Sequence, residues 1–193
     1  MTIMRLDPAA YRHTPWKNRG GITVDIADAY RAGAEPGDWD AVLWRLGRTE
    51  IVVPAPFSHL PGYDRILTVI EGRGLILQAE DGAALDVREA FRPVHFRGED
   101  ALTSRLEAGR VAVLNLIADR QHAIDMAVLE GGASRALTAA INVLYAPAES
   151  AVVFGGERFS LGADEALRVD AQGEVQVERG RVILAAISSR SAP

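Results

Sequence analysis

The sequence contains no cysteine and only one lysine, Lys17. Without cysteine the chain has no disulfide bond, no thiolate nucleophile and no cysteine-based zinc site, and we expect a cytoplasmic protein. Every other basic residue is arginine. Lysine carries a compact charge and arginine a planar one, so the two are not interchangeable. A single lysine kept between Trp16 and Asn18, shortly before Gly20-Gly21, indicates that its ammonium group is used, and the alternative is a solvated loop lysine.

A basic surface and long apolar runs are also missing. The formal net charge is −5, and no run of five basic residues occurs, so we expect no nucleic-acid partner. The longest apolar-rich stretch, 139–154, is interrupted by Asn142, Pro147 and Glu149. It is too short and too polar to cross a bilayer, and the first residues lack the apolar core of a signal peptide. We therefore expect no membrane association.

Short runs of alternating or β-forming residues recur along the chain, separated by glycine, proline or Asp-Gly. In the first half the runs lie at 1–6, 22–27, 39–51, 65–70, 75–78, 91–96, 103–106 and 111–117. In the second half they lie at 123–129, 139–146, 151–154, 166–169, 174–178 and 181–187. This pattern predicts an all-β protein made of small barrels or sandwiches.

The two halves also resemble each other. Residues 66–77 and 151–161 share the order of strand, glycine-containing turn and strand. We therefore predict two tandem β-barrels, 1–120 and 121–193, with strand exchange at their boundary.

Common catalytic and metal-binding patterns are absent. The four histidines are His13, His59, His95 and His122, and they form no His-x-His pair. A metal site needs three or four convergent ligands, so we predict none. Ser58 and His59 are adjacent, which does not orient the imidazole onto the hydroxyl, and no nucleophile elbow or phosphate-binding loop exists. We predict no catalytic residue and no cofactor.

Several cationic and polar residues lie on predicted strands. Arg45 and Arg65 each belong to a strand, and Asn115 interrupts the apolar run 111–117. If they meet inside one barrel, they form an anion site suited to a carboxylate. The structural alternative is that the arginines pair with Asp64 or Glu71 and that Asn115 bridges backbone groups.

Four motifs resemble the HutD/Ves family over about residues 1–190. They are Pro15-Trp16-Lys17-Asn18-x-Gly20-Gly21-x-Thr23, Trp44-Arg45, Pro56-Phe57-Ser58-x-x-Pro61-Gly62-x-x-Arg65 and Leu114-Asn115. The resemblance implies a bicupin, which is a chain of two cupin barrels. It also implies a role in bacterial histidine utilisation, as a modulator that binds an intermediate such as urocanate or a formylated or formimino glutamate. The chain departs from the family at Arg19, where glycine is common, and at Arg48.

The leading hypothesis is a metal-independent bicupin that binds a small carboxylate. Lys17 and Arg65 would neutralise the carboxylate, and the other predicted site residues would orient or enclose it. These residues are Trp16, Asn18, Arg45, Phe57, Ser58 and Asn115. One alternative is an enzyme that uses Lys17 or His59 as a general base. Another is a protein-interaction module, and a homodimer is compatible with each hypothesis.

Overall fold

The computed structural model describes residues 2–16 and 21–190. Its regular elements are eighteen β-strands and two single turns of 3-10 helix, Pro8–Ala10 and Trp39–Ala41. The all-β prediction is confirmed. The chain divides into two compact units. The first unit is Arg12–Gln121, and the second consists of the described residues of Met1–Tyr11 and His122–Pro193.

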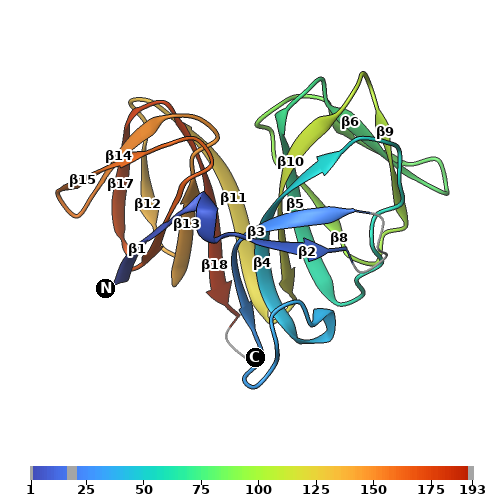
Figure 1. The fold of residues 1–193 in the computed structure, drawn as a ribbon, viewed down its shortest axis with the longest axis horizontal. Coiled ribbons are helices and arrows are strands. Elements are labelled where there is room, and N and C mark those ends of the chain that lie inside the picture. Colours follow the sequence, from blue (N-terminus) through green and yellow to red (C-terminus); the bar gives the residue numbers. More distant parts are fainter. Residues whose placement is uncertain (1, 17–20, 191–193) are drawn as a thin grey trace. The chain divides into compact units, whose positions relative to one another are not determined.

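The first unit contains two antiparallel sheets (Figure 1). Its six-stranded sheet has the order β2-β3-β4-β10-β5-β8, and its three-stranded sheet has the order β7-β6-β9. The strands are β2 (Arg12–Pro15), β3 (Ile22–Tyr30), β4 (Val42–Ile51), β5 (Tyr63–Glu71), β6 (Leu75–Ala79), β7 (Ala84–Val87), β8 (Val94–Arg97), β9 (Leu102–Leu106) and β10 (Val111–Asp119).

The second unit also contains two sheets, with the orders β1-β16-β13-β18-β11 and β12-β17-β14-β15. Its strands are β1 (Thr2–Leu6), β11 (His122–Glu130), β12 (Ser134–Leu137), β13 (Ile141–Tyr145), β14 (Ser150–Phe154), β15 (Glu157–Leu161), β16 (Ala166–Asp170), β17 (Gly173–Arg179) and β18 (Arg181–Ser189). Residues 1–11, which the sequence-based division assigned to the first barrel, include β1, which pairs with β16 of this unit.

The two units repeat one topology. The order β5-β10-β4 in the first unit corresponds to β13-β18-β11 in the second, and β7-β6-β9 corresponds to β15-β14-β17. Even β12, which pairs with β17, has a counterpart in the isolated bridge between Pro56 and Thr103 of β9. Each β-strand directs alternate side chains to opposite faces, so each unit encloses its own apolar core.

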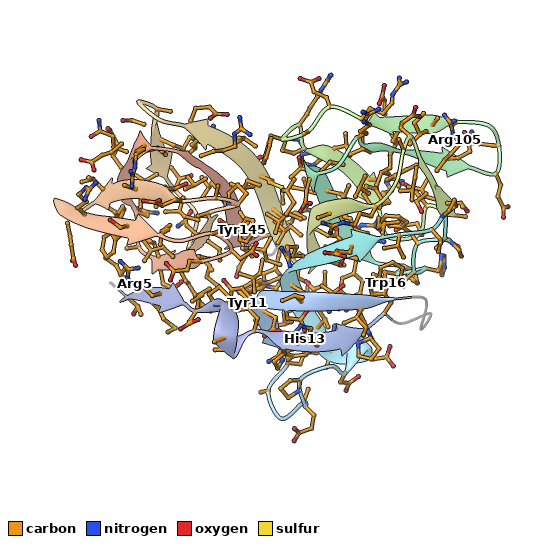
Figure 2. The ribbon with its side chains drawn as sticks, turned by 45° about the horizontal axis from the view of Figure 1, so that its top comes forward. Arg5, Tyr11, His13, Trp16, Arg105 and Tyr145 are labelled. Carbon is orange, nitrogen blue, oxygen red and sulfur yellow. The ribbon has the colours of Figure 1, made fainter. Side chains whose placement is uncertain are left out.

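Both cores are built from the apolar residues that the strand pattern supplies. Leu67, Val69 and Leu77 are fully buried in the first unit, and Val152 and Leu167 in the second. Figure 2 shows the side chains that fill each unit. The packed core of the first unit supports the floor of the cavity described below.

One strand pairing differs from the sequence-based interpretation. The order of strand, turn and strand over residues 66–77 is typical of a hairpin, but β6 pairs with β7 and β9 in the other sheet. Gly72 and Gly74, between β5 and β6, have φ values of 99° and 87°. Glycine tolerates such angles, and a side chain at Gly74 would come within 2.3 Å of Arg88 Cα. The turn therefore carries the chain from one sheet into the other.

Within residues 2–16 and 21–190, no helix is long and apolar enough to cross a membrane.

Candidate ligand-binding site

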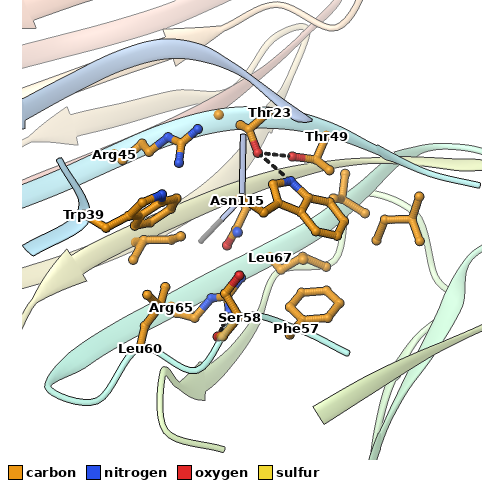
Figure 3. Close-up of a pocket in the computed structure, with 15 residues that line it drawn as sticks. Thr23, Trp39, Arg45, Thr49, Phe57, Ser58, Leu60, Arg65, Leu67 and Asn115 are labelled. Carbon is orange, nitrogen blue, oxygen red and sulfur yellow. Dashed lines mark hydrogen bonds between the residues drawn. The ribbon is translucent and has the colours of Figure 1, made fainter. Parts of the chain in front are cut away.

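A cavity opens inside the first unit, between the large sheet and the segment that follows β4 (Figure 3). Its volume is about 530 Å³, the open space at its mouth included. The lining residues are Trp16, Thr23, Trp39, Arg45, Gly47, Thr49, Ile51, Phe57, Ser58, Leu60, Arg65, Leu67, Val113, Asn115 and Ile117.

Six of the eight residues predicted for the ligand site line this one cavity. They are Trp16, Arg45, Phe57, Ser58, Arg65 and Asn115. The other two, Lys17 and Asn18, lie outside the described residues, as does Arg19. The fold thus brings together residues that are up to 99 positions apart in the sequence. Their role in binding a ligand stays a prediction.

Arg45 reaches the cavity from β4 and is paired with a buried acid. Its side chain is 3% exposed, and Nε donates to Oδ1 of Asp25 on β3. Asp25 is 4% exposed, and its second oxygen accepts a hydrogen bond from the Thr14 hydroxyl. The guanidinium also lies over the Trp39 ring, with Cζ 4.6 Å from the ring centroid. The ion pair neutralises the charge of Arg45 where water is excluded.

A second ion pair lies next to the Arg45–Asp25 pair. Arg12 lies 3.7 Å from Asp25 and forms an ion pair with Asp28. Burial raises the pKa of Asp28, and the nearby Arg12 opposes that rise. Two arginines and two aspartates therefore form a network without net charge, and Arg45 is its member that lines the cavity.

Arg65 has a different environment. It is 5% exposed, and among the described residues it makes no ion pair with a carboxylate. Its Nη1 donates to the Ser58 carbonyl oxygen at 3.4 Å, and its Cζ lies 5.0 Å and 4.8 Å from the ring centroids of Phe57 and Phe96. Burial lowers the pKa of Arg65 to about 9, because the charged form loses hydration without gaining a counter-charge. This guanidinium therefore lacks an anion.

Three buried polar atoms of the cavity lining have no hydrogen-bond partner among the described residues. They are Nη2 of Arg45, Nε of Arg65 and Oδ1 of Asn115. Unpartnered buried groups are uncommon, because each loses its hydration without compensation. Two donors and one acceptor with unused capacity indicate a site for a polar ligand or for ordered water.

Aromatic side chains and two threonines complete the wall. Trp16 donates from Nε1 to Oγ1 of Thr23 at 3.0 Å, and the hydroxyls of Thr23 and Thr49 are 2.7 Å apart, as Figure 3 shows. Trp39 and Phe57 add flat apolar surfaces. The indole of Trp16 is thus held by a hydrogen-bonded chain that runs through Thr23 to Thr49.

The structural alternative for the arginines is not observed. Asp64 pairs with Arg120, and Glu71 pairs with Arg110, so neither acid neutralises the arginines of the cavity. The sequence-based interpretation missed Asp25, the partner that Arg45 does have.

Gly47 is needed for this packing. A Cβ atom there would lie 2.3 Å from Cγ2 of Thr23, closer than real side chains approach. We expect Gly47→Ala to displace Thr23, break the Trp16–Thr23 bond and lower the free energy of unfolding by about 1–3 kcal/mol. Chemical denaturation measures this change. Gly82→Ala is a poor control because of its positive φ, so Ala84→Gly at an exposed strand position serves instead. Unchanged stability and Trp16 fluorescence in Gly47→Ala would contradict the role of Gly47.

A metal centre needs three or four convergent ligands. In the part of the chain that the structure describes, no three His, Cys, Asp or Glu side chains are close enough to hold a metal. His13, His59 and His95 are exposed, and none of them lines the cavity. The described lining therefore does not fit a metal centre, and the exposed His59 is poorly placed as a base acting in the cavity.

The second unit provides an internal comparison. Ile117 of β10 lies opposite Arg45 and Arg65 on the two neighbouring strands. Ser188 of β18 is the equivalent of Ile117, because each lies six positions after the first inward-facing valine of its strand. Ser188 lies opposite Ala123 on the neighbouring strand β11. Arg45 thus has an alanine at the equivalent position of the repeat, and a buried arginine there is no general requirement of the fold.

Comparison with known proteins agrees with this geometry. The family model described as HutD matches residues 8–185, which is nearly the whole chain. The chain belongs to the HutD family. One relative is an uncharacterised 21.2 kDa protein in the hutC 3′ region of Pseudomonas putida. It is 32% identical over 168 residues, and the match covers 86% of this chain and 85% of the relative.

Two solved structures have the same fold over both units. HutD from Pseudomonas fluorescens SBW25, in a formate condition, has a TM-score of 0.79 and 28% identity, and the match covers 98% of this chain and all of that one. A conserved protein of unknown function from Pseudomonas aeruginosa PAO1 has a TM-score of 0.84, 26% identity and the same coverage. The predicted bicupin fold of the HutD type is confirmed.

Proposed function

We propose that this HutD-family chain binds a small carboxylate in the cavity of the first unit, without a metal ion. The observation that carries the proposal is Arg65, a buried guanidinium with no carboxylate partner among the described residues. A buried charge is costly unless it is paired, and a ligand carboxylate would supply the missing charge. Arginine suits this role because its planar group can bind both carboxylate oxygens.

The remaining lining residues would orient the ligand. Nη2 of Arg45 and Oδ1 of Asn115 offer one donor and one acceptor to its polar groups. Trp16 and Phe57 would enclose its apolar part, and Ser58 would add a hydroxyl at the rim. Lys17 and Asn18, which precede Gly21 at the end of the Trp16 segment, are proposed to contact the same ligand.

The ligand is proposed to be an intermediate of histidine breakdown, such as urocanate or a formylated or formimino glutamate. Two relatives support this choice, since one is called HutD and the other lies in the hutC 3′ region. In this proposal the protein modulates histidine utilisation by holding the intermediate rather than by converting it. The donor set supports binding over catalysis, because no acid–base pair lines the described cavity.

Titration calorimetry with urocanate, formylglutamate and formiminoglutamate tests the proposal. We expect at least one of them to bind the wild type, and we expect Arg65→Met and Lys17→Ala to weaken that binding at least about tenfold. Arg110→Met is the matched control, because Arg110 is exposed, pairs with Glu50 and Glu71, and does not line the cavity. Absence of binding to all three acids, or equal binding by Arg65→Met, would refute the proposal.

A further inference from the structure

A second cavity opens in the second unit, between its five-stranded sheet and the segment that runs from β12 into β13. Its volume is about 480 Å³, the open space at its mouth included. The lining residues are Ala123, Ile124, Asp125, Arg135, Ala136, Thr138, Ala139, Asn142, Leu184, Ala186 and Ser188. All of them belong to the second unit, so this cavity is separate from the carboxylate site proposed above.

The repeat places this cavity where the first unit has its own. On β18 the residues two, four and six positions after the first inward-facing valine line the second cavity, and the same three positions of β10 line the first. They are Leu184, Ala186 and Ser188 on β18, and Val113, Asn115 and Ile117 on β10. The fold thus forms a recess at the same place in both units, and the side chains decide what each recess can hold.

Ala186 leaves a gap between two polar residues. It lies opposite Asp125 on β11 and opposite Asn142 on β13. Residues paired in this way share a face of the sheet, so the three side chains form one row across three strands. Neighbouring strands are about 4.8 Å apart, so the Cα atoms of Asp125 and Asn142 are about 10 Å apart. Only the methyl group of Ala186 lies between them in this row.

Asn142 offers a buried hydrogen-bond acceptor to this cavity. The residue is fully buried, and its Nδ2 donates to the carbonyl oxygens of Ala139, Val169 and Ala171 at 3.0, 3.2 and 3.4 Å. These carbonyls fix which end of the amide carries the nitrogen. In the described part of the chain, Oδ1 has no hydrogen-bond partner. A buried acceptor in this state loses its hydration without compensation, so it favours a molecule that brings a donor.

Asp125 borders the same gap with a carboxylate. Nη2 of Arg135 lies 3.2 Å from its Oδ2, and both side chains are about half exposed. Exposed ion pairs contribute only about 0.2–1 kcal/mol. A ligand cation can therefore take the place of Arg135 beside Asp125 at small cost, because the arginine stays in contact with water.

We infer that the second unit binds a small molecule through a primary ammonium group, which lies over Ala186 between Oδ1 of Asn142 and the carboxylate of Asp125. An ammonium group has three N–H donors and no acceptor, so it can donate to both sides of the gap. Its charge strengthens both hydrogen bonds. The side chain of Leu184 and the alanines of the lining offer apolar contacts to the rest of such an amine.

The test uses n-butylammonium and butyramide, two probes of similar size that both carry N–H donors. At pH 7 the first is charged and the second is neutral, because alkylammonium groups have a pKa of about 10. The NMR shifts of the backbone amides measure binding and report its place. We expect n-butylammonium to shift the resonances of Asp125, Asn142 and Ala186 and to bind at least about fivefold more tightly than butyramide.

Two variants separate the charge from the space. Asp125→Asn keeps the shape of the side chain and removes its charge, so we expect it to weaken n-butylammonium binding at least about fivefold and to leave butyramide unaffected. Ala186→Val fills the gap, and we expect it to abolish binding of both probes. Glu178→Gln is the control, because Glu178 is an exposed acid of the same unit that pairs with Arg158 and does not line the cavity.

Each outcome has a separate meaning. Shifts confined to the first unit, or no saturable shift with either probe, overturn the site in the second unit. Equal binding of the two probes by the wild type, or unchanged n-butylammonium binding by Asp125→Asn, overturns the assignment of an ammonium group. Undiminished binding by Ala186→Val overturns its placement over Ala186. The wild-type comparison decides the inference even where a variant does not fold, and its failure leaves the carboxylate proposal standing, since that site lies in the first unit.

Discussion

Arg65→Met is expected to raise the free energy of unfolding by about 1–3 kcal/mol at pH 7 while weakening carboxylate binding at least about tenfold. The wild type buries this guanidinium with no carboxylate partner among the described residues, and the unpaired charge costs several kcal/mol. Methionine fills a similar space with an apolar, adaptable chain. The loss of the contacts with Phe57 and Phe96 offsets about 0.5–2 kcal/mol of the gain.

The pH dependence of this gain has a defined sign. Burial lowers the pKa of Arg65 to about 9, whereas an arginine in the unfolded chain keeps a pKa above about 12. Between these values the unfolded wild type binds more protons than the folded one, so wild-type stability rises with pH relative to the variant. The advantage of Arg65→Met is therefore complete below pH 9 and shrinks above it.

Urea denaturation at pH 7 and pH 10 measures both effects, with Arg110→Met as the control at an exposed, ion-paired site. We expect the control to change neither the stability nor its pH dependence. A variant less stable than the wild type at pH 7 would mean that the two phenyl rings fully compensate the charge of Arg65. In that case the cavity would not need an anion.

Asp25→Ala is expected to have the opposite effect, a loss of about 3–5 kcal/mol in the free energy of unfolding. Removing one partner of a buried ion pair leaves the other charge uncompensated, here Arg45. The Thr14 hydroxyl also loses its acceptor. Asp25→Asn retains an acceptor for Arg45 and is expected to lose less than the alanine variant.

The matched control for this prediction is Asp125→Ala. Asp125 also pairs with an arginine, Arg135, but both side chains are about half exposed. Exposed pairs contribute little because water screens them, so we expect the melting temperature to stay within error. Equal losses in the two alanine variants would show that the burial of the Asp25–Arg45 pair has no special importance.

Much of the fold follows from local patterns in the sequence. Alternating residues such as those of 22–27 and 181–187 define strands, and glycine and proline mark their ends, so the all-β fold and its repetition could be predicted. The clustering of Arg45, Arg65 and Asn115 could be predicted because the motifs that contain them occur together in one family. Both predictions depend on short segments that can be recognised without knowing their neighbours.

The partner of Arg45 could not be predicted in this way. Asp25 lies on the neighbouring strand opposite Gly47, and the pairing of β3 with β4 shifts register just after it. Such bulges depend on packing across the sheet, which no local pattern records. The alternation of 22–27 also places Ile22 on the apolar face, yet Ile22 is 57% exposed. The face that carries Thr23 and Asp25 is the one turned toward the cavity.

The pairing of β1 with β16 has a consequence for biosynthesis. Thr2 lies opposite Asp170, so the ribosome synthesises β1, the first strand of the second unit, long before it synthesises the partner strand β16. At about 5–20 residues per second, β1 waits roughly 8–30 s, during which the whole of Arg12–Gln121 is made. The first unit can therefore fold while the N-terminal strand is still unpaired. A tag or deletion at the N-terminus is accordingly expected to disturb the last unit to be synthesised, not the one that contains the cavity.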